Sequence, residues 1–260
     1  MLTAYMAYRN GLTDALAFLS RISLPHSGAQ TEHAPRMPDV PASVPWFPLA
    51  GAVLGLLAAA LPLLARTLLP ASSPVLAAWM YVCALAWLTR ALHWDGLADL
   101  CDACGSNATG ERFWDIMKDS RIGAFGVLGL IMGVGISGIA AFLCLEKGLW
   151  PALVLAPAFG RCMVVPLGRL TAPSARSSLA VLVFPGLRGR AAAFSCAATC
   201  LACMALAGTG ATLLALVCAA TALVPLRSLA NRHGGCNGDF FGTAIIIGET
   251  ALLLGAALAG

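Results

Sequence analysis

The amino-acid sequence predicts an all-α fold, a polytopic integral membrane bundle of about seven transmembrane helices. Hydrophobic residues make up 59% of the chain and charged residues 11%, and the mean hydropathy is +0.84. A typical soluble domain has about 25% charged residues, so this composition excludes an ordinary soluble fold. The apolar residues also come in runs that are long enough to cross about 30 Å of hydrocarbon.

The first 20 residues predict an amphipathic or half-buried helix, because Arg9, Asn10 and Asp14 recur at about one helical turn. We expect no cleaved signal peptide, since no basic segment precedes a clean apolar core. The expected spans cover residues 46–69, 75–92, 124–145, 149–168, 190–207, 211–226 and 242–259. They form one catalytic domain, residues 1–260, in which the cytoplasmic loops 93–123, 169–189 and 227–241 lie near the active site.

The distribution of cationic residues predicts the orientation in the membrane. With the N-terminus in the cytoplasm, only Arg66 and Lys147 lie on the outer side and Arg161 lies inside a span, so thirteen of the sixteen Lys and Arg residues are cytoplasmic. Such an excess is typical of cytoplasmic loops. We therefore expect a bacterial cytoplasmic (inner) membrane protein in contact with the lipid bilayer. The net charge of +4 needs no nucleic-acid partner.

The stretch "ALHWDGLADLCDACG", residues 91–105, carries the first polar motif. Asp95, Asp99 and Asp102 follow the i, i+4, i+7 spacing of a single helical face. Three carboxylates on one face are hard oxygen ligands that suit Mg²⁺, although a solvated acidic face would show the same spacing. His93 could belong to the metal shell, donate to a phosphate or be an interfacial histidine. Zinc at Cys101 and Cys104 is disfavoured, because no second C-x-x-C pair completes four ligands.

Two further polar motifs follow at the same membrane level. In "MKDSRIGAFG", residues 117–126, Lys118 and Arg121 are three apart, which on a helix places both cations on one face where they could grip a phosphate. As isolated cations they could equally be membrane anchors. In "NRHGGCNGDFFG", residues 231–242, glycines could bring backbone amides close to an anion and Asp239 could complete a metal site or orient a hydroxyl. A plain glycine-rich connection is the alternative.

All three motifs lie near one membrane face, as a cytoplasmic active site would require. A conduction path would instead need polar groups through the depth of several spans. A transporter is also disfavoured, because the "DGLAD" segment has no repeat in the second half of the chain.

The motifs "HWDGLADLCDACG", "IMKDSRIGAFGVLGL" and "GGCNGDFFG" together resemble those of the cobalamin 5'-phosphate synthase family, also called adenosylcobinamide-GDP ribazoletransferase. The opening "WFPLAGAVLGLL" and the "LAPAFGR" of the fourth span resemble the family as well, so the likeness covers nearly the whole chain. Ala103 stands where a glycine is expected, and Cys236-Asn237 replaces a more usual pair. Neither departure changes an acidic residue, so activity is still expected.

The resemblance implies the last assembly step of vitamin B12 synthesis. Such enzymes join adenosylcobinamide-GDP to α-ribazole or its 5'-phosphate and release GMP. A Mg²⁺ cofactor would then be held by Asp95, Asp99 and Asp102, and the general base would be Asp239 or Asp119. The expected substrate- and phosphate-binding residues are His93, Lys118, Ser120, Arg121, Arg232, Gly234, Gly235 and Asn237. A CDP-alcohol phosphotransferase is the alternative enzyme, but "LADL" after Asp95-Gly96 lacks the arginine of its usual pattern.

Overall fold

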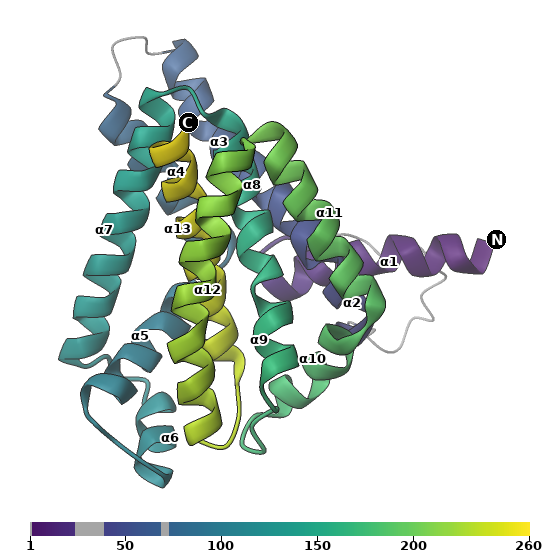
Figure 1. The fold of residues 1–260 in the computed structure, drawn as a ribbon, viewed down its shortest axis with the longest axis vertical. Coiled ribbons are helices and arrows are strands. Elements are labelled where there is room, and N and C mark those ends of the chain that lie inside the picture. Colours follow the sequence, from purple (N-terminus) through teal and green to yellow (C-terminus); the bar gives the residue numbers. More distant parts are fainter. Residues whose placement is uncertain (1, 24–38, 69–72) are drawn as a thin grey trace.

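The computed structural model describes residues 2–23, 39–68 and 73–260, and within these ranges the chain is almost entirely helical. The helices in chain order are α1 (Leu2–Leu19), α2 (Val40–Ser43), the 3-10 helix η1 (Val44–Trp46), α3 (Phe47–Leu68), α4 (Pro74–Leu88), α5 (Leu92–Gly105), α6 (Glu111–Met117), α7 (Ala124–Glu146), α8 (Trp150–Cys162), α9 (Val164–Leu170), α10 (Ser178–Arg188), α11 (Arg190–Leu206), α12 (Thr209–Arg232) and α13 (Gly238–Ala259). Figure 1 shows the long helices side by side, with α1 extending from the bundle.

Five helical segments are long and apolar enough to cross a membrane: Val40–Leu68, Ala124–Glu146, Trp150–Leu170, Thr209–Arg232 and Gly238–Ala259. The pairs α4 with α5 and α10 with α11 pass the same test only together, and they are bent by 89° and 74°. The described ranges therefore contain five such spans, or up to seven if each bent pair counts as one. This confirms the polytopic helical fold class. We treat α4 and α11 as the spanning members of the pairs, because a bend near a right angle turns α5 and α10 away from their direction.

The predicted span 75–92 ends too late. Helix α4 stops at Leu88, and Arg90 and Ala91 have φ angles of 57° and 54°, in the left-handed region. Two such residues in succession end the helix, and α5 then starts in a new direction. The exposed carbonyls of the last turn find donors elsewhere: the Arg21 amide donates to Leu88 O at 2.7 Å, and Arg21 Nε donates to Trp87 O at 2.7 Å. Arg21, which follows α1, therefore caps the C-terminus of α4.

The expected loops 93–123 and 169–189 are largely helical. The first contains α5 and α6, and the second contains α10. Helices α5 and α6 carry polar residues and α10 has only 11 residues, so none of the three forms the long apolar run on which the prediction of spans rests. For α1, residues from Gly11 onward are buried or half-buried, with Asp14 only 1% exposed. The side chains of Arg9 and Asn10 lie outside the described part, so the amphipathic pattern that rests on them stays a prediction.

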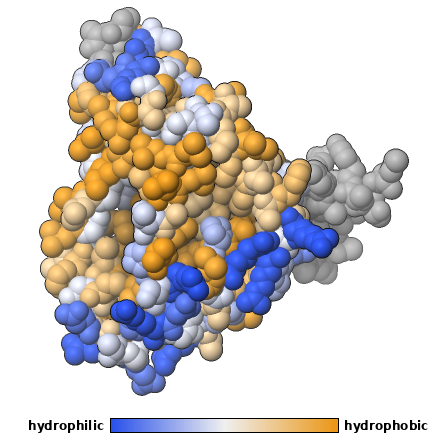
Figure 2. Space-filling view, in the orientation of Figure 1, coloured by the Kyte–Doolittle hydropathy of each residue, from blue (hydrophilic) through white to orange (hydrophobic). Residues whose placement is uncertain are grey.

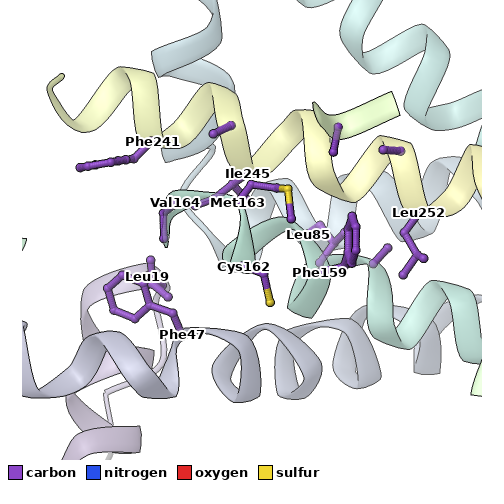
Figure 3. Packing of buried hydrophobic residues seen from close by; sticks show 14 of the residues in the cluster. Leu19, Phe47, Leu85, Phe159, Cys162, Met163, Val164, Phe241, Ile245 and Leu252 are labelled. Atoms are coloured by element: carbon purple, nitrogen blue, oxygen red, sulfur yellow. The ribbon is translucent and has the colours of Figure 1, made fainter. Parts of the chain in front are cut away.

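Helices α8 and α13 form the centre of the bundle, and Figure 3 shows Phe159, Cys162 and Ile245 among the side chains packed there. Small residues permit the close approach of these helices, as in other membrane bundles. A Cβ on Gly51 or Gly55 of α3 would collide with the backbone of α8. A Cβ on Gly248 of α13 would lie 2.7 Å from Gly160 Cα of α8. The core is therefore held by backbone proximity as much as by large side chains.

The surface divides into zones of different hydropathy. Figure 2 shows a broad hydrophobic band across the bundle, with hydrophilic residues gathered at the lower end and at the upper tip. Large apolar side chains such as Leu56 of α3, Ile131 of α7 and Val217 of α12 are more than half exposed. An apolar surface of this extent is stable only when another apolar phase covers it, which suggests a lipid bilayer.

Candidate active site

Four aspartates gather where α5 crosses the start of α13. Helix α5 supplies Asp95, Asp99 and Asp102, and the first turn of α13 supplies Asp239. The crossing is close because Gly96 has no side chain: a Cβ there would lie 2.7 Å from Asp239 Cα. Thr243 Oγ1 donates to Gly96 O at 3.3 Å and holds the two helices together. Residues 144 positions apart, counted from Asp95 to Asp239, thus meet at the lower end of the bundle in Figure 1.

Burial and mutual repulsion shift the pKa of a carboxyl group in this cluster. Burial, together with the negative charges of Asp95, Asp239 and Asp102, raises the pKa of Asp99 to about 7. With this pKa the carboxyl is only partly ionised at neutral pH, and a nearby positive charge would favour its ionised form. Among the described residues, however, no group of three His, Cys, Asp or Glu side chains is arranged so that it could hold a metal ion. The magnesium assignment therefore stays a prediction.

Asp102 has a structural partner that the sequence motif does not reveal. Its carboxylate accepts hydrogen bonds from the backbone amides of Gly123 and Gly126, both at 2.7 Å. These amides belong to the N-terminus of α7, where free N–H groups and the helix dipole favour a negative charge. A Cβ on either glycine would collide with the Asp102 carboxylate. The glycines of "RIGAFG" therefore allow α5 to cap α7.

The predicted helical face of Lys118 and Arg121 does not exist. Helix α6 ends at Met117, and Lys118 begins the turn that leads into α7. Arg121 instead pairs with Asp119, with Nη2 at 2.7 Å from Oδ2 and Nε at 3.0 Å from Oδ1. These hydrogen bonds lower the pKa of Asp119 to about 2. Because a strongly acidic carboxyl is a weak base, Asp239 is the better of the two candidate bases. Ser120 lies exposed between the paired residues.

The glycines of the third motif terminate α12. Gly234 and Gly235 have φ angles of 80° and 133°, and the Gly235 amide donates to Ala230 O at 2.8 Å. Such bonds satisfy the last carbonyls of a helix. Gly235 also lets the chain approach Ser174, which donates its amide to Cys236 O at 2.9 Å. The Gly235 amide is therefore not free to bind an anion, and a substrate-binding role of Gly235 stays a prediction.

The polar residues of that motif separate into two groups. His233 stacks on Phe113 of α6 with ring centroids 3.7 Å apart, and Trp114 Nε1 donates to His233 O at 3.0 Å. Burial and the charge of Arg232 lower the pKa of His233, so it is neutral at pH 7. Arg232 lies beside it and lines two hollows of about 320 and 290 Å³. These residues thus face α6, whereas Asp239 faces α5.

Asn237 positions Asp239. Its side chain accepts a hydrogen bond from the Phe240 amide at 3.3 Å and so caps α13. Its Nδ2 donates to Asp239 Oδ2 at 2.6 Å. One amide side chain therefore fixes both the start of the helix and one oxygen of the carboxylate beside Gly96.

His93 lies at the start of α5 and is 4% exposed. Its Nε2 is buried, and none of the described residues forms a hydrogen bond with it. The main chain at His93 packs against Gly242 of α13, where a Cβ would lie 3.1 Å from His93 Cα. His93 is therefore located on the same helix crossing as Asp239.

The sequence motifs missed a buried ion pair between α8 and α13. Arg161 is 0% exposed, and its Nη1 donates to Glu249 Oε1 and to Pro157 O, both at 2.8 Å. Its Nε and Nη2 have no partner within the described ranges. An acid and a base inside separate apolar spans are a signal of such a pair, because an isolated charge is costly there. The pair connects the two central helices of the bundle.

Taken together, the fold and the site define a multi-span helical membrane protein with an acidic cluster at one end. The comparisons specify the class further: the Cobalamin-5-phosphate synthase family matches residues 11–257. This chain belongs to that family. The resemblance that the three motifs carry is thereby confirmed, and with it the assignment to the transferases of cobalamin biosynthesis.

Several relatives are similar over most of their length. A protein named adenosylcobinamide-GDP ribazoletransferase from Nitratidesulfovibrio vulgaris (strain Miyazaki F) is 44% identical over 95% of this chain and 95% of its own. Proteins of the same name from Leptothrix cholodnii and Geotalea daltonii are 36% and 33% identical, over 93% and 92% of this chain and 92% and 94% of their own. No solved structure matches the chain.

Proposed function

We propose that this protein transfers the adenosylcobinamide phosphate group of adenosylcobinamide-GDP to α-ribazole or its 5'-phosphate and releases GMP. The name of the relatives states the donor and the ribazole acceptor. The observation that carries the proposal on the structural side is the meeting of Asp239 with the three aspartates of α5. A diphosphate donor needs such a site, because negative charge that develops on phosphate oxygens must be compensated.

The reaction is an exchange of ester bonds at one phosphorus atom. The acceptor hydroxyl forms a new bond to the phosphorus that bears the cobinamide arm, and the bond to the GMP oxygen breaks. Asp239 takes the hydroxyl proton, since Asn237 holds its carboxylate at the crossing of α5 and α13. We infer that Lys118, Arg121 and Arg232 bind the diphosphate oxygens, and Arg121 would then exchange its ion pair with Asp119 for a phosphate contact.

We infer that the site binds a divalent cation, because carboxylate oxygens are the ligands that Mg²⁺ prefers. Asp95, Asp99 and Asp102 would hold Mg²⁺, which often uses only one or two carboxylates and completes its shell with water and substrate phosphates. The raised pKa of Asp99 supports this fit, because a cation would offset the repulsion that raises it. When bound, Mg²⁺ would neutralise charge on the diphosphate. The absence of a three-ligand group in the described ranges is compatible with a site that substrate completes.

The proposed location is the bacterial cytoplasmic membrane, with the aspartates facing the cytoplasm. The excess of Lys and Arg in the expected cytoplasmic segments supports this orientation.

The proposal is tested with detergent-purified protein, adenosylcobinamide-GDP, α-ribazole and Mg²⁺, followed by chromatography for GMP. We expect GMP and a corrinoid product in equal amounts, loss of turnover in EDTA and recovery with Mg²⁺. Full turnover in EDTA would remove the metal from the proposal. If no GMP is released and the protein instead releases CMP from a CDP-alcohol, the protein is a CDP-alcohol phosphotransferase and the proposed reaction is wrong.

A further inference from the structure

A second feature of the site is an apolar pocket of about 110 Å³ that ends at Asp239. Figure 3 shows Leu19 and Phe47 together near Val164, with Phe241 of α13 across from them, and all four line this pocket. Helix α10 closes another side with Leu179 and Val183. Of the fourteen lining residues, only His93 and Asp239 are polar. The pocket is therefore an apolar slot with one carboxylate and one imidazole in its wall.

The imidazole is the part of the wall that requires a partner. His93 is 96% buried, and its Nε2 forms no hydrogen bond within the described ranges. Buried polar nitrogens are almost always paired, so an unpaired one in a pocket indicates a ligand with a matching group. One ring nitrogen can form one hydrogen bond with such a ligand.

We propose that this pocket binds the flat heteroaromatic base of the acceptor nucleoside. This inference rests on the proposed function, since ribazole is a ribonucleoside whose base is an alkylated benzimidazole. Such a base presents apolar faces and a single free ring nitrogen. It matches a slot lined by Phe18, Phe47 and Phe241 with one free polar atom at His93. The ribose attached to that base then lies next to Asp239, where its hydroxyl gives up a proton.

The other parts of the substrates fit this pocket poorly. A corrin ring is several times larger than about 110 Å³. A guanine base carries several donors and acceptors on its edge, and burial of unpaired polar groups is costly. A lipid chain would fill the apolar part but would leave His93 Nε2 without a partner. The pocket therefore selects for a small, flat and mostly apolar group with one hydrogen-bonding atom.

The test uses two leucines of α10 as a matched pair. Leu179 lines the pocket and is 42% exposed, whereas Leu182 does not line it and is 52% exposed. Leu179→Trp should fill the pocket, and Leu182→Trp should add the same bulk outside it. Binding of labelled α-ribazole to the purified full-length proteins is measured by equilibrium dialysis, and KM is measured for each substrate. We expect at least tenfold weaker α-ribazole binding in Leu179→Trp, an unchanged KM for adenosylcobinamide-GDP and normal values in Leu182→Trp.

A second variant guards against misfolding of the first. Leu179→Ala adds no bulk, and loss of its apolar contact should weaken α-ribazole binding several-fold while the protein elutes normally on gel filtration. Unchanged α-ribazole binding in both Leu179 variants would overturn the pocket assignment. An increase in KM for the donor alone would overturn it too. Dialysis measures binding and needs no turnover. If wild type binds α-ribazole, Leu179→Trp does not, and wild type releases no GMP, the pocket assignment is supported and only the proposed reaction is wrong.

Discussion

At the scale of single residues, the two candidate bases differ in what holds them. Asp239 is a half-buried carboxylate that Asn237 orients, whereas Asp119 is bound by Arg121 and has a pKa of about 2. We expect kcat to fall at least 100-fold in Asp239→Asn, in keeping with the usual contribution of a general base. Asp119→Asn should keep kcat within tenfold of wild type. Comparable losses in the two variants, measured by GMP release, would contradict this assignment.

Acidification should weaken the proposed metal site. The pKa of Asp99 is raised to about 7, so below pH 7 its carboxyl takes up a proton that a cation must displace. The Mg²⁺ concentration for half-maximal turnover should therefore rise about tenfold for each pH unit below 7 and level off above it. Measurement of GMP release against Mg²⁺ between pH 6 and pH 8 checks this. A flat profile in wild type would argue against Asp99 as a ligand.

The ion pair of Arg161 and Glu249 should behave as a unit. Removal of one member leaves the other charge buried and unpaired, which costs about 3–5 kcal/mol. Arg161→Met and Glu249→Gln should each lower the thermal unfolding temperature, and the double variant should lose less than the sum of the two. Arg188→Met, at an exposed position of α10, serves as the control. Additive losses would show that the two side chains stabilise the bundle independently.

At the scale of elements, the crossing of α5 and α13 depends on Gly96. An added methyl group would lie 2.7 Å from Asp239 Cα, so Gly96→Ala must push the two helices apart. Such overpacking costs about 1–3 kcal/mol, and it displaces Asp239 from the other aspartates. We expect kcat/KM for GMP release to fall at least tenfold. Gly135→Ala in α7, where a Cβ meets nothing within 4 Å, should be neutral or slightly stabilising. Equal activity of both alanine variants would show that the crossing tolerates separation.

The elements differ in how far the sequence predicts them. Helices α3, α7, α12 and α13 follow from their long apolar runs. The break between α4 and α5 does not, because Arg90 and Ala91 adopt left-handed angles without the glycine or proline that usually mark such a turn. For the same reason the sequence predicted a helical face for Lys118 and Arg121, although α6 ends one residue before Lys118.

In the candidate site, too, the sequence predicts some features and misses others. Spacing alone indicated the acidic face of α5, since local periodicity encodes it. The contact of Gly96 with Asp239 and the capping of α7 by Asp102 depend on how distant helices cross. Single-sequence patterns contain no information on such crossings.

For the whole molecule, the proposed orientation makes a topological prediction. A reporter that is active only outside the cytoplasm should be active when fused after Glu146, at the end of α7. It should be inactive when fused after Gly105 or Arg190, because Gly105 lies within the expected cytoplasmic loop 93–123 and Arg190 directly follows the expected cytoplasmic loop 169–189. A cytoplasmic reporter at the same three sites gives the complementary control. Activity of the outer reporter at Gly105 would place the acidic cluster on the side without nucleotide substrates.

The buried ion pair also has a consequence for the depth of the reactive carboxylate. Glu249 and Asp239 lie on one helix, ten residues and therefore about 15 Å of axial rise apart. A rigid helix cannot slide without moving both, so the contact of Glu249 with Arg161 fixes the height of Asp239 relative to the lipid headgroups. The ion pair in the middle of α13 thus sets the distance between the reacting hydroxyl and the membrane surface. A shift of the pair by one helical turn would move Asp239 about 5.4 Å along the bilayer normal, out of reach of the aspartates on α5.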